Sequence, residues 1–129
     1  MKVSEFWIRD MEIPIVNRDE LRNLVDKKGN YVLVDVRELE ELKHGMIPTA
    51  KNLPMSELLE AFDLPEEGFK AKYGFDKPKK ENNIIFYCRT GERSRVATQL
   101  AIQKGFKKAR NYFGSVYDWS DFDSNVKKY

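Results

Sequence analysis

The sequence predicts one α/β domain built on a mainly parallel sheet with helices on both faces. Two continuous apolar runs, residues 31–34 and 84–87, are typical of strands that are buried on both sides. Segments in which apolar residues recur at helical spacing alternate with such runs, and this alternation favours a parallel sheet. A chain of 129 residues is long enough for one domain with a hydrophobic core and too short for two of ordinary size. We therefore expect residues 1–129 to form a single domain.

The first elements follow from signals at their ends. Residues 12–16 predict a short strand, and Pro14 favours a position at the edge of the sheet. Asn17 is suited to cap the following helix, because Glu20 stands three residues later in the pattern of a capping box. Gly29 is a natural stop for that helix.

The rest of the chain continues the alternation. In order we expect a strand at 31–34, a short helix at 38–43, a turn at 45–48, a short strand at 50–53, a helix capped by Ser56, a polar loop at 76–83, a strand at 84–87, a helix at 95–101, a short strand at 111–113 and a helix capped by Ser115. Between residues 65 and 75 two glycines interrupt a helical face, so the pattern there is mixed. Because ligands bind beyond the carboxyl ends of parallel strands, Asp35 and Cys88 belong at the same rim.

The composition limits the possible functions. The net charge of +2 argues against a nucleic-acid-binding surface, and acidic residues intersperse the lysine-rich segments near 77–80 and 127–128. One cysteine cannot form an internal disulfide, and one cysteine with one histidine offers no zinc site. We therefore expect no zinc site and no nucleic-acid partner.

Membrane and targeting segments are not predicted either. No apolar run approaches the roughly 20 residues that a membrane-spanning helix needs. Residues 1–10 carry acidic side chains and no apolar core, so they resemble neither a secretory signal nor a transit peptide. The lone cysteine fits a reducing compartment. We expect no membrane partner and a cytoplasmic or mitochondrial location.

The cysteine lies in residues 87–94 (YCRTGERS), on a tight turn between a strand and a helix. A thiol in that position faces the free N–H groups and the positive dipole end of the helix, which favour an anion. Arg89 and Arg93 add positive charge, which stabilises a thiolate. Gly91 permits a backbone conformation in which successive N–H groups point inward as an anion nest. We interpret Cys88 as a nucleophile rather than an inert buried thiol.

Four stretches resemble, in this order, the rhodanese (sulfurtransferase) family: residues 34–38, 45–54, 86–94 and 114–119. The resemblance covers about residues 14–119. It implies a single rhodanese-like domain with a central sheet of about five strands. Segment 72–78 resembles an insertion of the single-domain eukaryotic members, which include thiosulfate sulfurtransferases and heat-shock-type rhodaneses. The chain departs from the family pattern at Met46, where the family usually has His, and at Thr49, where it usually has Gly.

The resemblance implies a sulfurtransferase that moves a sulfane sulfur from thiosulfate, through a Cys88 persulfide, to cyanide, glutathione or a protein thiol. In the family a loop of six residues, here Cys88 to Arg93, goes with sulfur transfer, whereas seven-residue loops go with phosphatase and arsenate reductase activity. Ser94 stands where Cys-x-x-x-x-x-Arg phosphatases have their arginine. The implied reaction needs no metal and no organic cofactor. One alternative is a persulfide carrier that delivers sulfur to a protein partner. The other, which the loop spacing disfavours, is a phosphatase- or arsenate reductase-like enzyme. The residues expected to bind the donor are Arg89, Thr90, Gly91, Glu92, Arg93 and Ser94.

Three further polar residues flank this predicted site. Asp35 and Arg37 either contact the substrate or brace the active-site loop through hydrogen bonds and a charge pair. Histidine is a common general base, and His44 is the only one in the chain. A thiolate that its surroundings already stabilise needs no base, so we interpret His44 as a surface residue.

Overall fold

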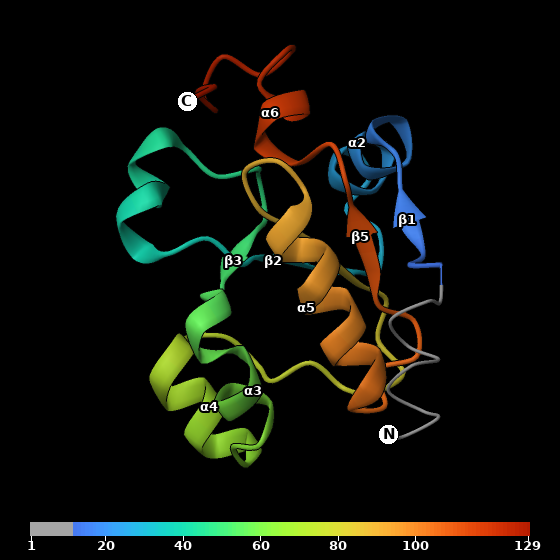
Figure 1. The fold of residues 1–129 in the computed structure, drawn as a ribbon, viewed down its shortest axis with the longest axis vertical. Coiled ribbons are helices and arrows are strands. Elements are labelled where there is room, and N and C mark those ends of the chain that lie inside the picture. The colour runs from blue at the N-terminus through green and yellow to red at the C-terminus, as the bar shows by residue number, and fades with distance from the viewer. Residues whose placement is uncertain (1–11) are drawn as a thin grey trace.

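The computed structural model describes residues 12–129, which form a five-stranded parallel sheet flanked by helices (Figure 1). The strands lie in the order β1-β5-β4-β2-β3. The predicted α/β class and the parallel sheet are confirmed. Residues 1–10, for which we expected no targeting signal, lie outside the described residues. The strands are β1 (Ile15–Val16), β2 (Val32–Asp35), β3 (Lys51–Asn52), β4 (Ile84–Tyr87) and β5 (Arg110–Tyr112).

Helices connect the strands in this part of the chain. Asn17 caps the first of them as predicted, because its side chain accepts a hydrogen bond from the backbone N–H of Glu20 at 2.8 Å. Over residues 12–129, none of the helices has the length and apolar composition that crossing a membrane requires. The α-helices are α2 (Arg18–Asp26), α3 (Leu58–Phe62), α4 (Glu66–Tyr73), α5 (Glu92–Gln103) and α6 (Ser115–Trp119), and the 3₁₀ helices are η1 (Leu39–His44) and η2 (Met55–Glu57).

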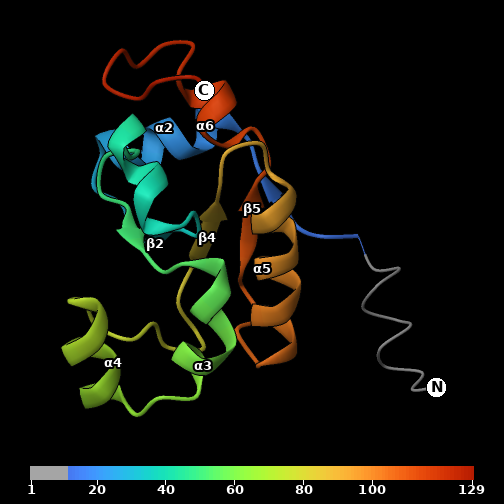
Figure 2. The same cartoon turned by 60° about the vertical axis from the view of Figure 1, so that its left-hand side comes forward.

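The sheet separates two hydrophobic layers. Along β4, Ile84 and Phe86 point into a layer shared with α3, α4 and α5, whereas Ile85 and Tyr87 point into a layer shared with α2 and α6. All four side chains are buried, which accounts for the continuous apolar run. Figure 2 shows α5 on one side of β4 and β5 and α2 on the other. Helices thus cover both faces, as the sequence predicts.

Two of the predicted helix caps are wrong. Ser56 lies within η2, and its hydroxyl donates to the Glu38 carboxylate at 3.0 Å. Ser115 is the first residue of α6, has a φ of 56°, and does not cap the helix with its side chain. In both cases the hydroxyl binds a residue distant in sequence, Glu38 for Ser56 and Cys88 for Ser115. The local pattern assigns both hydroxyls to helix ends.

Two other segments are more regular than the sequence predicts. The mixed segment after Pro65 forms α4, which ends at Gly74 in the left-handed conformation with a φ of 80°. Helix α5 begins at Glu92 rather than at residue 95, directly after the turn that carries the cysteine. The turn that carries the cysteine is therefore shorter than expected, because the helix begins three residues earlier.

The strand register brings the predicted site residues together. Asp35, at the end of β2, pairs with Tyr87, at the end of β4. Cys88 is the next residue, so it lies just beyond the same edge of the sheet. This edge is the carboxyl end of the parallel strands, where ligands of such sheets bind.

Candidate active site

Cys88 lies at the base of a short loop between β4 and α5. Its side chain is buried, with 1% of its surface exposed. Gly91 ends the loop with a φ of 94°, a region that favours glycine. In this conformation the Gly91 N–H donates to the Cys88 Sγ at 3.1 Å. The predicted inward-pointing N–H group is therefore present.

The surroundings of Sγ favour the thiolate. Burial by itself would raise the pKa of the Cys88 thiol, because it penalises the charged form. Hydrogen bonds from the Ser94 hydroxyl and from the backbone N–H groups of Ser94, Gly91 and Thr90 outweigh burial and hold the pKa below its ordinary value. The Ser94 Oγ lies 3.4 Å from Sγ. A buried sulfur anion held by N–H and O–H donors is what a sulfur nucleophile requires.

The segment after β5 binds the backbone of the cysteine loop. The backbone N–H groups of Val116 and Tyr117 donate to the carbonyl oxygens of Cys88 and Arg89 at 3.1 and 3.0 Å. The Ser115 hydroxyl accepts the Cys88 N–H at 3.1 Å. The start of α6 therefore fixes the backbone at the nucleophile, and Ser115 is a site residue that the sequence did not indicate.

A second contact fixes the other end of the loop. Asn111, a buried residue of β5, donates from its amide to the Gly91 carbonyl at 3.3 Å. A Cβ on Gly91 would overlap the backbone oxygen of Phe113. Position 91 therefore requires glycine for space as well as for its φ angle. An asparagine in a strand gives no local signal of this role, so sequence patterns could not have identified it.

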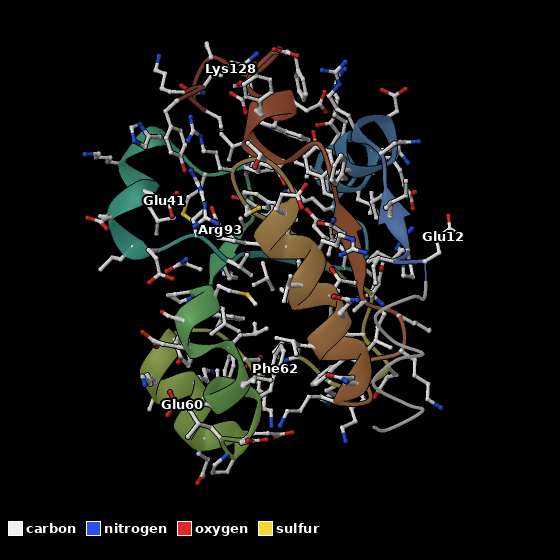
Figure 3. All side chains as sticks on the ribbon, in the orientation of Figure 1. Glu12, Glu41, Glu60, Phe62, Arg93 and Lys128 are labelled. Atoms are coloured by element: carbon white, nitrogen blue, oxygen red, sulfur yellow. The ribbon has the colours of Figure 1, made fainter. Side chains whose placement is uncertain are left out.

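Arg93 and Glu41 form an ion pair at the mouth of the loop. The two guanidinium nitrogens lie 2.7 and 2.9 Å from the two carboxylate oxygens. Figure 3 shows the two side chains reaching toward each other from η1 and the start of α5. Hydrogen bonds from Arg93 lower the pKa of Glu41 to about 2 despite partial burial. Glu41 is a second residue of the site that the sequence did not indicate.

The other predicted loop residues face outward. Arg89, Thr90 and Glu92 are exposed, whereas Ser94 is buried against the sulfur. The guanidinium carbon of Arg89 lies 4.6 Å from the centroid of the Tyr129 ring. The structure therefore brings the nucleophile, three backbone donors, one hydroxyl and two guanidinium groups to the same end of the sheet.

Asp35 and Arg37 form a fully buried ion pair beside the loop. Arg37 donates to both oxygens of Asp35, at 2.7 to 3.1 Å. Its other donors reach the carbonyl oxygens of Gly45 and Glu41 and the hydroxyl of Tyr129. All five guanidinium N–H groups thus have partners in the protein. This geometry favours the bracing role, and the braced segment is η1 with its following turn rather than the cysteine loop.

His44 is not a simple surface residue. It is half-buried, and its ring stacks on that of Tyr129 with 3.8 Å between centroids and 12° between planes. The interpretation of His44 as a surface residue is therefore wrong in one respect: its ring has a packing partner. It has this partner because the segment after α6 returns to η1, a contact that no local pattern indicates.

Comparison with known proteins identifies the family. The chain matches the Rhodanese-like domain family over residues 17–122, which is more than half of its length. The chain belongs to the rhodanese-like domain family. The predicted resemblance is therefore confirmed.

Relatives of this rhodanese domain cover it to different extents. A Schizosaccharomyces pombe relative, named as a mitochondrial protein, is 47% identical over 90 residues, which are 70% of this chain and 63% of that protein. Human thiosulfate:glutathione sulfurtransferase is 42% identical over 112 residues, 86% of this chain and 96% of that protein. The solved structure of the human single-domain sulfurtransferase TSTD1 has a TM-score of 0.81 and 40% identity, and the match covers 87% of this chain and 99% of that one. The chain thus spans under two thirds of the first relative and nearly all of the others.

One departure from the rhodanese pattern is visible in the backbone. Thr49 stands where the family usually has glycine, and it adopts a φ of 75°. Its hydroxyl lies 2.7 Å from the Tyr31 hydroxyl. The strain is local to the turn before β3 and does not reach Cys88.

A large cavity of the rhodanese domain lies away from the cysteine. It has a volume of about 540 Å³ and lies near the start of β2, at the opposite end of the strands from Cys88. Chemistry therefore identifies the site better than cavity size does. Within residues 12–129, no group of three or more His, Cys, Asp or Glu side chains is placed to hold a metal ion.

Proposed function

We propose that this chain, acting as a single rhodanese domain, is a sulfurtransferase that moves a sulfane sulfur from thiosulfate to a thiol. The observation that carries the proposal is the state of Cys88. It is the sole cysteine, it is buried, and hydrogen bonds to its sulfur lower the pKa of its thiol. The human relative named thiosulfate:glutathione sulfurtransferase supports the choice of donor and acceptor.

The first half-reaction loads the cysteine. The Cys88 thiolate attacks the outer sulfur of thiosulfate and forms a new S–S bond. The bond between the two sulfur atoms of thiosulfate breaks, and sulfite leaves with the electron pair of that bond. The terminal sulfur of the persulfide then lies among the N–H groups of the loop. Arg89 and Arg93 stabilise the departing sulfite by their charge.

The second half-reaction removes the sulfur from the Cys88 persulfide. The thiolate of an acceptor attacks the terminal sulfur, forms the acceptor persulfide and regenerates the Cys88 thiolate. Glutathione or a protein thiol is the acceptor in the cell, and cyanide serves in an assay. Neither half-reaction requires a proton acceptor at Cys88, because the loop already stabilises its anion.

An oxyanion enzyme, a phosphatase or arsenate reductase, is less well supported. Such an enzyme needs a wider ring of donors and an arginine that grips two oxygens of a tetrahedral anion. Position 94 carries serine, and this serine is buried with its hydroxyl toward Sγ. A single terminal sulfur fits that loop better than a phosphate does.

The test is the intact mass of the protein after brief exposure to thiosulfate. We expect a gain of one sulfur atom, lost on addition of cyanide and absent in Cys88→Ser. No gain in the wild type would overturn the proposal. Repeated turnover with thiosulfate and glutathione supports an enzyme, whereas one burst followed by arrest supports the alternative of a persulfide carrier with a protein partner.

The location we propose is the mitochondrion or the cytoplasm. Both compartments keep thiols reduced, which a sulfur carrier with one cysteine needs. The relative named as mitochondrial supports the first of the two. Subcellular fractionation with an antibody to the native protein distinguishes them.

A further inference from the structure

Tyr129 lies at the mouth of the active site although it is far from Cys88 in sequence. The segment that carries it follows α6, and its end lies beside η1 (Figure 1). The Lys127 N–H donates to the His44 carbonyl at 2.7 Å. A Cβ on Gly45 would overlap the Asn125 carbonyl oxygen, so the two segments approach as closely as backbones can. Backbone contacts thus hold residues 125–127, just before Tyr129, against the end of η1.

The ring of Tyr129 lies between an imidazole and a guanidinium. His44 stacks on it with 3.8 Å between centroids. The guanidinium carbon of Arg89 is 4.6 Å from the same centroid. Because His44 fills one face of the ring, Arg89 lies against the other. A cation is attracted to the face of an aromatic ring, so Tyr129 holds Arg89 in place.

The hydroxyl of Tyr129 connects two more charged groups. It accepts a hydrogen bond from Arg37 at 3.2 Å and donates one to Glu41 at 2.9 Å. Glu41 in turn binds Arg93 through both carboxylate oxygens. Tyr129 therefore contacts one arginine of the cysteine loop directly and the other through a single carboxylate.

The two arginines differ in how they are held. Arg93 has Glu41 as a charged partner, and this ion pair is direct. Among residues 12–129, the Tyr129 ring is the only side-chain partner of the exposed Arg89 guanidinium. Without the ring, the side chain of Arg89 would have to be ordered each time an anion binds, at a cost in affinity.

We propose that Tyr129 is a positioning residue that sets the preference of the site for anionic donors by holding Arg89 at the mouth of the cysteine loop. The inference rests on the proposed function and names a residue through which that site selects its donor. The ring is the part that acts on Arg89, and the hydroxyl joins η1 to the segment after α6.

The test compares Tyr129→Leu, which removes ring and hydroxyl, with Tyr129→Phe, which keeps the ring. The first readout is the rate of alkylation of Cys88 by iodoacetate, an anion, divided by the rate with neutral iodoacetamide. We expect this ratio to fall about threefold in Tyr129→Leu and to stay near the wild-type value in Tyr129→Phe. The KM for thiosulfate should rise by a similar factor in Tyr129→Leu, with kcat little changed.

Two controls keep the result specific. In an Arg89→Ala background, Tyr129→Leu should lower the alkylation ratio no further, because the residue acts through Arg89. Tyr31→Leu, at the opposite end of the sheet, should leave the ratio unchanged. An unchanged or increased ratio in Tyr129→Leu, or an additive loss in the double variant, would overturn the inference. Alkylation of Cys88 does not depend on sulfur transfer. A wild type that fails to transfer sulfur would therefore overturn the proposed function, while the alkylation ratio would still test the role of Tyr129.

Discussion

The Arg93 guanidinium binds the Glu41 carboxylate through two hydrogen bonds, at 2.7 and 2.9 Å. The sequence predicts that Arg93 serves the sulfur donor, but two of its five N–H groups are committed to this carboxylate. The pair places a negative charge beside the positive charge at the mouth of the site. An anionic donor therefore meets a smaller potential than two free arginines would give.

Changing each partner alone separates charge from geometry. Glu41→Gln keeps a hydrogen-bond acceptor but removes the negative charge, so kcat/KM for thiosulfate should rise about threefold. Arg93→Ala leaves the Glu41 carboxylate unpaired toward the donor, so kcat/KM should fall about tenfold. Steady-state assays at low ionic strength measure both. Effects of the same sign in the two variants would contradict the electrostatic explanation.

The same ion pair makes stability depend on pH. Hydrogen bonds from Arg93 lower the pKa of Glu41 from 4.5 to about 2. A carboxyl group whose pKa is lower in the folded state stabilises the fold above its unfolded pKa, and this stabilisation is lost as the pH falls from 4.5 toward 2. Because the Arg93 side chain is 38% exposed, we expect a contribution of only about 1 kcal/mol after solvent screening.

Urea unfolding at pH 7 and at pH 3 measures that contribution. The free energy of unfolding of the wild type should fall more on acidification than that of Glu41→Gln, because the variant has no group to protonate at position 41. Equal losses in the two proteins would show that the pair adds nothing to stability.

Ser94 is expected to set much of the reactivity of Cys88. Its hydroxyl and its N–H are the two strongest hydrogen-bond influences that lower the pKa of the thiol. Ser94→Ala removes the hydroxyl and keeps the N–H, so the pKa of Cys88 should rise toward the ordinary value of a thiol. The pH dependence of alkylation by iodoacetamide gives this value.

A matched serine shows whether the shift is specific. The Ser120 hydroxyl, just after the last helix, donates to the Tyr117 carbonyl and does not reach Cys88. Ser120→Ala should therefore leave the alkylation profile unchanged. A profile that is unshifted in Ser94→Ala would mean that backbone donors alone stabilise the thiolate.

Local patterns predict the sheet and the nucleophile because both depend on neighbours in sequence. The run Ile84–Tyr87 is apolar throughout because both faces of its strand are covered. The cysteine, the glycine and the two arginines follow it within the next six residues. Gly91 could be assigned a special backbone conformation from its place before a helix, and its φ of 94° agrees.

The residues that shape the mouth could not be predicted in this way. Glu41 meets Arg93 across 52 positions, and Ser115 meets Cys88 across 27. Each belongs to a segment whose local pattern has another plausible explanation, a surface helix for Glu41 and a helix cap for Ser115. Only the packing of η1 and α6 at the same rim of the sheet brings them to the loop.

Arg37 should matter for stability rather than for donor binding. It is fully buried, and the protein satisfies all of its donors. Arg37→Ala leaves Asp35 buried without its charged partner, which should lower the free energy of unfolding by about 3 to 5 kcal/mol. Chemical denaturation measures the loss. In the fraction that remains folded, a KM for thiosulfate raised more than kcat is lowered would instead indicate a contact with the donor.

Gly91 and Gly74 form a matched pair that separates backbone strain from steric overlap. Both have positive φ angles, 94° and 80°. A Cβ at position 74 would meet nothing within 4 Å, whereas one at position 91 would overlap the Phe113 backbone. Gly74→Ala should therefore cost only the strain of the left-handed conformation, about 1 kcal/mol.

Gly91→Ala should cost the same strain and also force the loop away from β5. We expect a loss of more than about 3 kcal/mol in the free energy of unfolding. The N–H that donates to Sγ moves with the loop, so the pKa of Cys88 should rise as well. Thermal unfolding and iodoacetamide alkylation, applied to both variants, measure the two effects. If Gly91→Ala behaved like Gly74→Ala in both measurements, the contact with Phe113 would not be what holds the loop around the sulfur.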